Sequence, residues 1–593
     1  MQEPQSQSDH TRTEHAKKLL ADLARLSLTK QALFVLALFF FFVSSFIIIT
    51  KLIDSQLVEI PRHGGQLVEG IIGRPRFINP IIAKSDADRD MSELIYSGLL
   101  RPTIGGDLIP DLAKDYSISE DGMTYTFTLR DDIVWHDGVA ITSDDILFTI
   151  DKVRDSRLAI KSPRRASWEG VDVTAPDTKT VVFKLKQPYA PFLDSATMGI
   201  LPKHIWQNVP DDEFDVSYYN IEPIGSGPYR VKGVMRDAGK GLPRYYDLIA
   251  FKRYTFGEPY ITDLRIQFFG NNQEIEQAFS DHTIDQMHTL FPEEAKALET
   301  HGGVVSRTPL PRIFALYFNQ NQQPIFTDKA VRKALDTAVN KDAIVAKVLG
   351  GYGKSIDSPL PFLPSVSTST AKDTTGSSTD RILAAKAILE KAGWSLNTAN
   401  LYEKTDKKKK TVTLLSFSIA LPDVPELRSA AEMIKSDWQK IGADVTIKVF
   451  EQSNFASDVL SQRKYDILFY GQVISRVPDP YAYWHSSQRN APGLNVALYT
   501  NKNVDKLIED ARKESDETAR NTILSKFVST VQDDTPAVFL YSPDFLYATS
   551  PSARDVNIGF MTTESERFIG IENWYIESER VWKWIAQRIS RNT

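Results

Sequence analysis

An uncharged run of 20 residues near the start of the chain, residues 31–50 (QALFVLALFFFFVSSFIIIT), limits its fold more than any other feature. A helix of this length measures about 30 Å, the thickness of the hydrocarbon core of a bilayer. The competing interpretation is a cleaved signal peptide, whose apolar region usually has about 7–15 residues and precedes a small-residue cleavage site. Because the run is longer and no convincing site follows it, we predict an uncleaved transmembrane helix over residues 31–51.

The charges that flank the run predict its orientation. The 15 residues before it carry four cations, whereas the 15 residues after it carry two, Lys51 and Arg62. Cytoplasmic flanks hold the excess of Lys and Arg, so residues 1–30 should be cytoplasmic, and the chain after a linker over 52–63 should lie outside the membrane. Residues 15–28 have helical apolar spacing with basic residues between, and they either lie on the inner membrane surface or extend the anchor helix.

Composition narrows the chemistry that the chain can perform. Its 593 residues include no cysteine, which excludes disulfides, thiolate metal sites, cysteine nucleophiles and a lipid-modified cysteine anchor. The 70 basic and 76 acidic residues give a net charge of −6, so there is no general attraction to nucleic acid. Four lysines at 407–410 end a segment, residues 403–410, that is typical of a solvated hairpin tip. A patch for an anionic surface is the alternative.

Strand and helix patterns alternate from residue 64 onward, without a second long apolar run. Strands are predicted at 125–129, 179–185, 411–417 and 445–450, and helices at 330–348, 381–392, 427–440, 503–513 and 518–532. Gly393 and Gly442 stand where a helix end favours a left-handed residue. Residues 364–380 are rich in Ser and Thr and read as an exposed loop. The pattern predicts a mixed α/β or α+β body.

We find no set of residues that would form a catalytic or metal-binding site. Neither an H-E-x-x-H nor a G-x-S-x-G motif occurs, and residues 350–355 lack the first glycine of a phosphate-binding loop. Residues 86–90 begin like a calcium loop, but Met91 and Ser97 replace its required Gly and Glu, so an acidic helix start is the simpler interpretation. His136 and Asp137 are adjacent, which favours a structural turn over a general-base pair. We therefore expect neither an enzyme nor a bound metal or cofactor.

Short segments along the whole outer part of the chain carry a family resemblance. They are residues 77–100, 107–113, 119–129, 135–138 (WHDG), 223–229 (PIGSGPY), 317–319, 331–334, 385–394 and 478–480 (PDP), followed by 493–495 and 533–536. In this order they resemble the extracellular solute-binding proteins of family 5, the receptors of ABC importers for oligopeptides, dipeptides and nickel. The most specific part is 119–129 followed by the WHDG turn.

The resemblance implies a three-lobed, periplasmic-binding-protein-like α/β fold of type II, cluster C, over residues 64–593. Lobe I is expected over about 64–100, 222–308 and 541–593, lobe II over about 101–221, and lobe III over about 309–540. Lobes I and III would close on a ligand while lobe II packs beside lobe I. Gly225 and Gly227 suit either a hinge or a purely structural turn near the crossing segments.

The resemblance also implies a function without covalent chemistry. Such receptors bury a ligand between their lobes, and peptide binders pair the peptide backbone with extended protein segments. Closure then presents a surface to the permease subunits of an ABC transporter. We expect an oligopeptide ligand, with a sugar, a nickel chelate or an opine-like anion as alternatives. A sensor or chaperone of the same fold is a further possibility, and a cell-surface peptidase is disfavoured by the missing motifs.

Position within the family nominates seven ligand-binding residues. Lys84, Ser85 and Asp86 should form one wall of the cleft, and Val473, Ser475, Arg476 and Asp479, before and within the Pro-Asp-Pro turn, should form the facing wall. Each of them is otherwise an ordinary surface residue. Tyr481, Tyr483 and Trp484 line a pocket or belong to the core.

Arg476 departs from the family pattern. Peptide-binding members typically have an acidic residue four positions before the last proline of this turn, where it pairs with the peptide α-amino group. A buried arginine there would repel an ammonium group. Asp479 or Asp86 then holds the amine, the peptide shifts register, Arg476 binds a ligand carboxylate or phosphate, or Arg476 points to solvent. We predict that binding does not require a free peptide α-amino group.

Overall fold

The computed structural model describes residue 18 and residues 27–239, 241–288, 291–300, 303–363, 378–406 and 411–589. Most of the predicted cytoplasmic segment 1–30 lies outside these residues. So does most of the helix expected over 15–28. So do positions 364–377 of the predicted loop and the four lysines at 407–410. The contacts divide the chain into two units, Met1–Arg62 with Glu577–Thr593, and His63–Ile576. Each unit is described by itself.

The first unit is built around one long helix. Helix α2 (Leu28–Gln56) has 29 residues and no buried side chain, and it is long and apolar enough to cross a membrane. It continues directly into β1 (Leu57–Pro61), so most of the segment expected as a linker over 52–63 is regular structure. Strand β1 pairs antiparallel with β23 (Ser578–Trp582), which leads into α18 (Lys583–Ile589).

A large mixed sheet forms the frame of the second unit. Its order is β20 (Asp444–Phe450), β19 (Ser416–Pro422), β21 (Ile467–Val473), β14 (Arg312–Phe318), β22 (Ala537–Thr549), β12 (Gln286–Met287), β2 (Gln66–Ile72), β11 (Asp263–Phe269), β10 (Pro243–Ala250) and β9 (Tyr229–Arg236). Strands β13 (Val304–Pro309) and β15 (Gly353–Ser355) also pair with β22. Helices and strands alternate along the chain, which confirms the α/β class.

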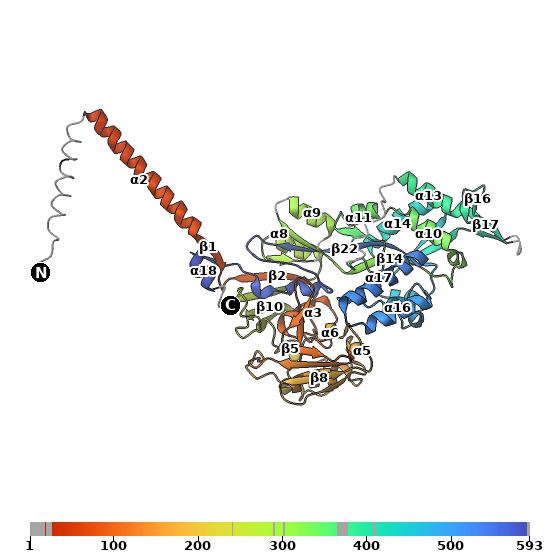
Figure 1. Ribbon diagram of the computed structural model, residues 1–593, viewed down its shortest axis with the longest axis horizontal. Coiled ribbons are helices and arrows are strands. Elements are labelled where there is room, and N and C mark those ends of the chain that lie inside the picture. The colour runs from red at the N-terminus through yellow and green to blue at the C-terminus, as the bar shows by residue number, and fades with distance from the viewer. Residues whose placement is uncertain are drawn as a thin grey trace. The chain divides into compact units, whose positions relative to one another are not determined.

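Strand β22 joins two halves of this sheet. Its first residues pair with β14, and its last six pair with β13, so one 13-residue strand runs from one half into the other. Figure 1 shows β22 between β2 on one side and β14 on the other. The boundary expected between lobes III and I, at residues 540–541, falls inside this strand. The two halves are therefore linked by continuous backbone at this position.

Strand β14 shows why its half of the sheet is buried on both faces. Alternate side chains of a strand point to opposite faces. Leu316 and Phe318 enter one apolar core with α10 (Lys329–Ala338), α13 (Ser378–Lys391) and α14 (Pro425–Lys440), whereas Ala315 and Tyr317 enter another with α16 (Lys502–Lys513) and α17 (Glu517–Asp534). Helices cover both faces, so the strand reads as a nearly continuous apolar run.

A separate four-stranded sheet lies in the region predicted as lobe II. Its order is β5 (Ala113–Ile118), β6 (Thr124–Leu129), β8 (Thr180–Lys184) and β7 (Asp172–Thr174). Tyr125, Phe127 and Leu129 alternate into the core, as the sequence pattern predicts. They share one hydrophobic core with Leu67 and Ile71 of β2, so this region packs against the first half of the large sheet.

The predicted elements match the structure except at two places, where one predicted element is divided into two. The helix expected over 330–348 is two helices, α10 and α11 (Lys341–Val348), because Asn340 caps a new helix by accepting the amide of Ala343. The strand expected over 411–417 is also divided, into β18 (Thr411–Leu414) and β19. Gly393 and Gly442 have φ values of +86° and +79°, which confirms both left-handed helix ends.

Gly225 and Gly227 lie where two backbone segments cross. A Cβ atom on Gly225 would lie 2.0 Å from the carbonyl oxygen of Ile95, and one on Gly227 would lie 2.7 Å from the Ile95 carbonyl carbon. Gly227 N also donates to that oxygen at 2.8 Å. The pair therefore permits a close backbone approach, which favours the structural interpretation of these glycines.

Candidate functional site

Helix α3 (Asp86–Ile95) is fixed at its start by two carboxylate oxygens. Asp88 accepts the amides of Lys84 and Ser85 with one oxygen and those of Arg76 and Phe77 with the other. The Ser85 hydroxyl in turn accepts the amide of Asp88 at 3.1 Å and completes a capping box. The acidic helix start expected from the sequence is confirmed, and its cap fixes where each later side chain of α3 points.

The three residues predicted for the first wall lie at this exposed helix start. Lys84, Ser85 and Asp86 are all exposed, and Asp86 pairs with Arg89 at 2.6 Å. None of the three lines the cavity described below. Arg89 and Glu93 of the same helix do line it, and they follow Asp86 at positions i+3 and i+7 on one helix face.

The residues predicted for the facing wall follow β21. Val473, the last residue of β21, is exposed and paired with Arg312 of β14, and the Ser475 hydroxyl donates to the carbonyl of Val477 at 2.7 Å. Arg476 and Asp479 both reach other parts of the unit. Val473 and Ser475 therefore make only local contacts, whereas Arg476 and Asp479 contact residues from distant parts of the sequence.

Arg476 is buried and neutralised, with 4% of its side chain exposed. Its Nη2 lies 2.7 Å from the Glu566 carboxylate and its Nε lies 3.6 Å from that of Asp194. Its Nη1 donates to the carbonyl of Gly106 at 3.2 Å, and its guanidinium lies 5.4 Å from the centre of the Phe560 ring. The alternative in which Arg476 points to solvent is therefore wrong. Arg476 joins the regions predicted as lobes I, II and III.

Asp479 forms a second bridge. Its Oδ2 accepts a hydrogen bond from the Tyr189 hydroxyl at 3.2 Å and lies 3.2 Å from Nε of Arg512. The Arg512 guanidinium also lies over the rings of Tyr189 and Tyr481, and its carbonyl accepts the amide of Ala190 at 2.9 Å. Both polar residues of the turn are thus engaged in contacts between predicted lobes II and III.

A cavity of about 340 Å³ opens beside the Arg476 contacts. Its walls come from α3, from residues 96–102, from residues 163–164 and 194–199, and from residues 562–572. Glu566 and Asp194, the two carboxylate partners of Arg476, both line it. Segments of predicted lobes I and II therefore enclose the cavity, and a residue of lobe III holds the two walls together.

Carboxylates outnumber guanidinium groups on the cavity walls. Glu93, Asp111, Asp194, Glu566 and Glu572 line it, against Arg89, Arg101 and Arg164. Burial, reinforced by the charge of Glu566, raises the pKa of Glu93 to about 7. Burial also raises the pKa of Asp111 to about 6, against the hydrogen bond from Thr255 and the charge of Arg101. The cavity is an acidic environment whose charge changes near neutral pH.

Some of these charges have partners and others do not. Arg101 donates to Glu572 at 2.7 Å and to the Tyr254 hydroxyl at 3.0 Å. Within the part of the chain that the structure describes, the side chains of Glu93 and Arg164 make no direct hydrogen bond or ion pair, although each feels the other's charge. The Ser92 hydroxyl is buried on the same wall and also has no partner among the described residues. One acid, one cation and one hydroxyl are thus available to a ligand.

A fully buried ionic cluster supports the wall that carries Glu566. Arg567 donates to Glu69 of β2 at 2.9 and 3.0 Å and to Asp90 of α3 at 2.8 and 2.9 Å, and none of the three is exposed to solvent. Burial raises the pKa of Glu69. Burial acts the same way on Asp90, but the charge of Arg567 holds the pKa of Asp90 below its ordinary value. The cluster fixes the η5 turn (Glu564–Phe568) against α3.

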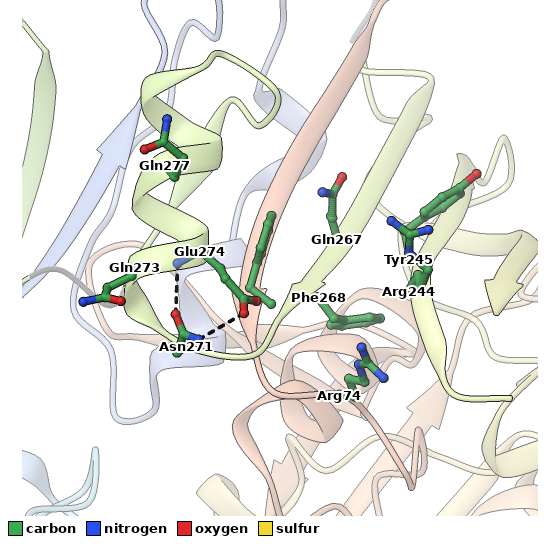
Figure 2. A pocket seen from close by; sticks show the side chains of 10 residues that line it. Arg74, Arg244, Tyr245, Gln267, Phe268, Asn271, Gln273, Glu274 and Gln277 are labelled. Carbon is green, nitrogen blue, oxygen red and sulfur yellow. Dashed lines mark hydrogen bonds between the residues drawn. The ribbon is translucent and has the colours of Figure 1, made fainter. Parts of the chain in front are cut away.

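A second, more open depression lies on the outer part of the large sheet. It measures about 730 Å³, and Figure 2 shows it between α8 (Asn272–Ser280) and the start of β10, with Gln267 and Phe268 of β11 between them. Arg74 and Arg244 face it from one side, and Glu274 on the other side is already bonded to Asn271. Two of its polar side chains, Asn271 and Glu274, serve the start of α8. Because the depression is also the more open of the two, the smaller cavity is the better candidate site.

Two other sequence interpretations are settled by the contacts. His136 bonds to the backbone of Gly225 and Gly227, whereas Asp137 bonds to His204, so the adjacent pair forms no catalytic unit. Trp484 is buried in a hydrophobic core, and Tyr481 lies over Arg512. Over the described residues, no group of three or more His, Cys, Asp or Glu side chains is arranged to hold a metal ion.

Sequence reasoning missed Glu93, Arg164, Asp194 and Glu566. For Glu93 a signal existed, since helical spacing extends the predicted wall from Asp86 to positions 89 and 93. For the other three no local signal exists, because they come from loops distant in the sequence from both predicted walls.

The family described as "Bacterial extracellular solute-binding proteins, family 5 Middle" matches residues 107–494. The chain is 27% identical over 533 residues to the oligopeptide-binding protein AppA of Bacillus subtilis, covering 87% of this chain and 92% of that protein. Two thirds of the chain thus match one family, and the resemblance to AppA extends over nearly all of it.

Solved structures show the same fold. AppA from Bacillus subtilis in complex with a nonapeptide aligns with a TM-score of 0.64 and 25% identity, covering 87% of this chain and all of that one. NikZ from Campylobacter jejuni in complex with Ni(L-His) aligns with a TM-score of 0.67 and 24% identity, covering 86% and 99%. The expected periplasmic-binding-protein-like α/β fold is confirmed, and it is shared by proteins with different ligands.

Proposed function

The chain belongs to the bacterial extracellular solute-binding proteins of family 5, and from this membership we propose that it captures oligopeptides and delivers them to an ABC importer. One observation carries the proposal, namely an enclosed cavity whose walls come from predicted lobes I and II and are held together by Arg476 from lobe III. Closure of lobe III on lobe I would be coupled to an occupied cavity through Arg476, which pairs with Glu566 and Asp194 on the cavity walls, and closure is what a permease can recognise.

The cavity chemistry suits a ligand that carries both charges. A peptide has an ammonium group, a carboxylate and backbone amides, and the cavity offers Glu93, Arg164 and the Ser92 hydroxyl. At about 340 Å³ it lies at the lower end of the range for ligand pockets, roughly 300–1,000 Å³, which favours a short peptide or one end of a longer one. Glu93 is our candidate for the ammonium group and Arg164 for a carboxylate.

The seven residues predicted from the sequence have different roles in this proposal. Arg476 and Asp479 would stabilise closure through their contacts between lobes instead of binding the ligand directly. Val473 and Ser475 remain candidate contacts for an extended peptide segment near the end of β21. Lys84, Ser85 and Asp86 would contact only the parts of a ligand that extend beyond the cavity.

We further propose a receptor role without catalysis, because the sequence contains neither a nucleophile motif nor a metal-binding motif. The proposed location is the outer face of the cell membrane, with α2 as a single-pass anchor, residues 1–30 inside and the solute-binding domain outside. The length and apolar character of α2 support the anchor, and the excess of cations before it supports the orientation.

Mass spectrometry of ligand retained through native purification of the full chain tests the function. We expect short peptides, released on denaturation. A sugar, an opine or a nickel chelate found instead would overturn the peptide assignment while leaving the receptor role. No retained or added solute binding at all would argue for a sensor or chaperone role.

Sequencing the N-terminus of protein extracted from membranes tests the anchor. We expect an N-terminus near Met1 and a requirement for detergent. Mature protein that begins after residue 50 and is free in the medium would identify α2 as a cleaved signal peptide.

A further inference from the structure

Two of the nine tryptophans in the chain are exposed, and they are neighbours. Trp582 is 41% exposed and Trp584 is 63% exposed. The other seven lie in the second unit, each at most 4% exposed: Trp135, Trp168, Trp206, Trp394, Trp438, Trp484 and Trp574. A large apolar side chain left in water is costly, and a cluster of them marks an interaction surface.

Both exposed tryptophans belong to the unit that contains the anchor helix. Trp582 is the last residue of β23 and pairs with Leu57, the first residue after α2. Trp584 lies in α18, which contacts both β1 and β23. Strand pairing therefore holds these two side chains beside the point where α2 ends.

The length of α2 places this point close to the membrane surface. A helix rises 1.5 Å per residue, so Leu57 lies about 6 Å beyond Ile53, the last apolar residue before Asp54, and about 10 Å beyond Thr50. The headgroup region on each side of the hydrocarbon core is roughly 5–8 Å thick. With α2 as the anchor, Trp582, paired with Leu57, would lie in the headgroup region or at its outer boundary, and tryptophan is enriched at the membrane interface.

The charges of α18 suit the same surroundings. It carries Lys583 and Arg588 and no acidic residue. The acidic residues of β1 and of the helix end are engaged locally, since Asp54 pairs with Arg580 at 3.1 Å and Glu59 accepts a hydrogen bond from Ser578. Glu579 is the one acidic residue of β23, and it is exposed, against two cations of α18. Tryptophan together with cations is the composition of a segment that lies in the membrane interface and binds anionic headgroups.

We propose that β23 and α18 form an interfacial collar, in which Trp582 and Trp584 insert into the headgroup region of the outer leaflet and Lys583 and Arg588 contact anionic lipid. This inference rests on the proposed single-pass anchor. The collar would hold the paired strands β1 and β23 at the membrane surface.

The test uses the full chain reconstituted into vesicles of phosphatidylcholine and phosphatidylglycerol with brominated acyl chains, which quench nearby tryptophan. We expect quenching in the wild type and its loss in a Trp582→Gln/Trp584→Gln double variant. Trp394→Phe, which removes a buried tryptophan from the second unit, is the matched control and should leave the quenching unchanged. Quenching should also fall when phosphatidylglycerol is omitted.

Flotation of the same vesicles after a high-salt wash separates the two proposals. Protein that does not float with the vesicles would overturn the anchor itself. Protein that floats but shows no quenching, or equal quenching in the double variant, would overturn the collar. Equal quenching with and without phosphatidylglycerol would overturn the part assigned to Lys583 and Arg588.

Discussion

Arg476 Nη2 lies 2.7 Å from the carboxylate of Glu566, and this contact joins residues 90 positions apart across predicted lobes III and I. Only 4% of the arginine side chain and 13% of the glutamate side chain are exposed. An ion pair so well shielded is not weakened by solvent as a surface pair would be. It therefore holds residues of predicted lobes III and I together.

Removal of one partner of this pair should favour the open arrangement. Breaking a buried ion pair typically costs about 3–5 kcal/mol, because the remaining charge is left without compensation. We expect Arg476→Ala to increase the radius of gyration of the ligand-free protein and to lower its melting temperature. Arg428→Ala, which breaks an exposed pair with Asp423, is the control and should change neither. An unchanged scattering curve for Arg476→Ala would show that the pair does not hold closure.

Ligand binding should favour the closed arrangement and so oppose the opening expected for Arg476→Ala. Trialanine at a hundredfold excess over its dissociation constant should stabilise the protein by about 2.7 kcal/mol, seen as a higher melting temperature. The radius of gyration of Arg476→Ala should fall toward that of the wild type as trialanine is added. Stabilisation without any change in scattering would argue against closure on the ligand.

Substitution of Gly225 tests whether the backbone crossing between Gly225 and Ile95 is rigid. A Cβ atom there would lie 2.0 Å from the backbone oxygen of Ile95, which cannot move without displacing α3. We expect Gly225→Ala to destabilise the protein by about 1–3 kcal/mol, the usual range for overpacking, measured by denaturant unfolding. Gly233→Ala is the control, because a Cβ atom at Gly233 meets nothing within 4 Å. A neutral Gly225→Ala would indicate a hinge that can adjust.

The pH dependence of stability should show the raised pKa of Glu93. Burial and the charge of Glu566 raise its pKa from 4.5 to about 7, so in this window the folded protein holds a proton that the unfolded chain has lost. The free energy of unfolding should therefore fall as pH rises through the window. Glu93→Gln should remove this component, measured as the difference between thermal melts of variant and wild type.

Two buried histidines contribute with the opposite sign. Burial lowers the pKa of His136 to about 4 and that of His288 to about 3. Between these values and the ordinary pKa of 6.5 the unfolded chain binds more protons, so their contribution to stability rises with pH. The comparison with Glu93→Gln isolates the glutamate, because the histidines are present in both proteins. Parallel pH profiles would contradict the assignment.

The fold could be predicted where the information is local or carried by family motifs. The alternation of β6, the acidic start of α3, and the left-handed Gly393 and Gly442 follow from neighbouring residues. The split at Asn340 was missed because apolar spacing continues across it while the capping side chain changes the local structure. Such an interruption is visible in sequence only as one polar residue.

The site could be predicted only in part, because its charges depend on distant partners. The sequence identified Arg476 as unusual, but its two carboxylate partners are 282 and 90 positions away, so their neutralising effect has no local pattern. Asp479, which the sequence predicts as a ligand contact, bonds to Tyr189 and Arg512, and neither partner could be predicted from local sequence. Charge balance in a buried site is a property of the three-dimensional structure.

The effect of blocking the ligand α-amino group on binding affinity tests the site most directly. The sequence-based prediction that no free amine is required rested on an uncompensated Arg476, and the structure removes that reason by pairing it with Glu566 and Asp194. Glu93 remains as a carboxylate without a direct partner among the described residues, and an ammonium group would compensate it. We therefore expect N-acetylation of trialanine to weaken binding at least about tenfold above pH 7, roughly 1.4 kcal/mol.

Glu93→Gln should abolish this discrimination, because the amide has no charge to offer an ammonium group. Arg476→Ala is the comparison, since it should weaken both peptides alike by disturbing closure. Calorimetric titration of the free and acetylated peptides into all three proteins separates the effects. Equal binding of the two peptides by the wild type would restore the sequence-based prediction. Discrimination that survives in Glu93→Gln would assign the amine to another carboxylate of the cavity, such as Asp111 or Asp194.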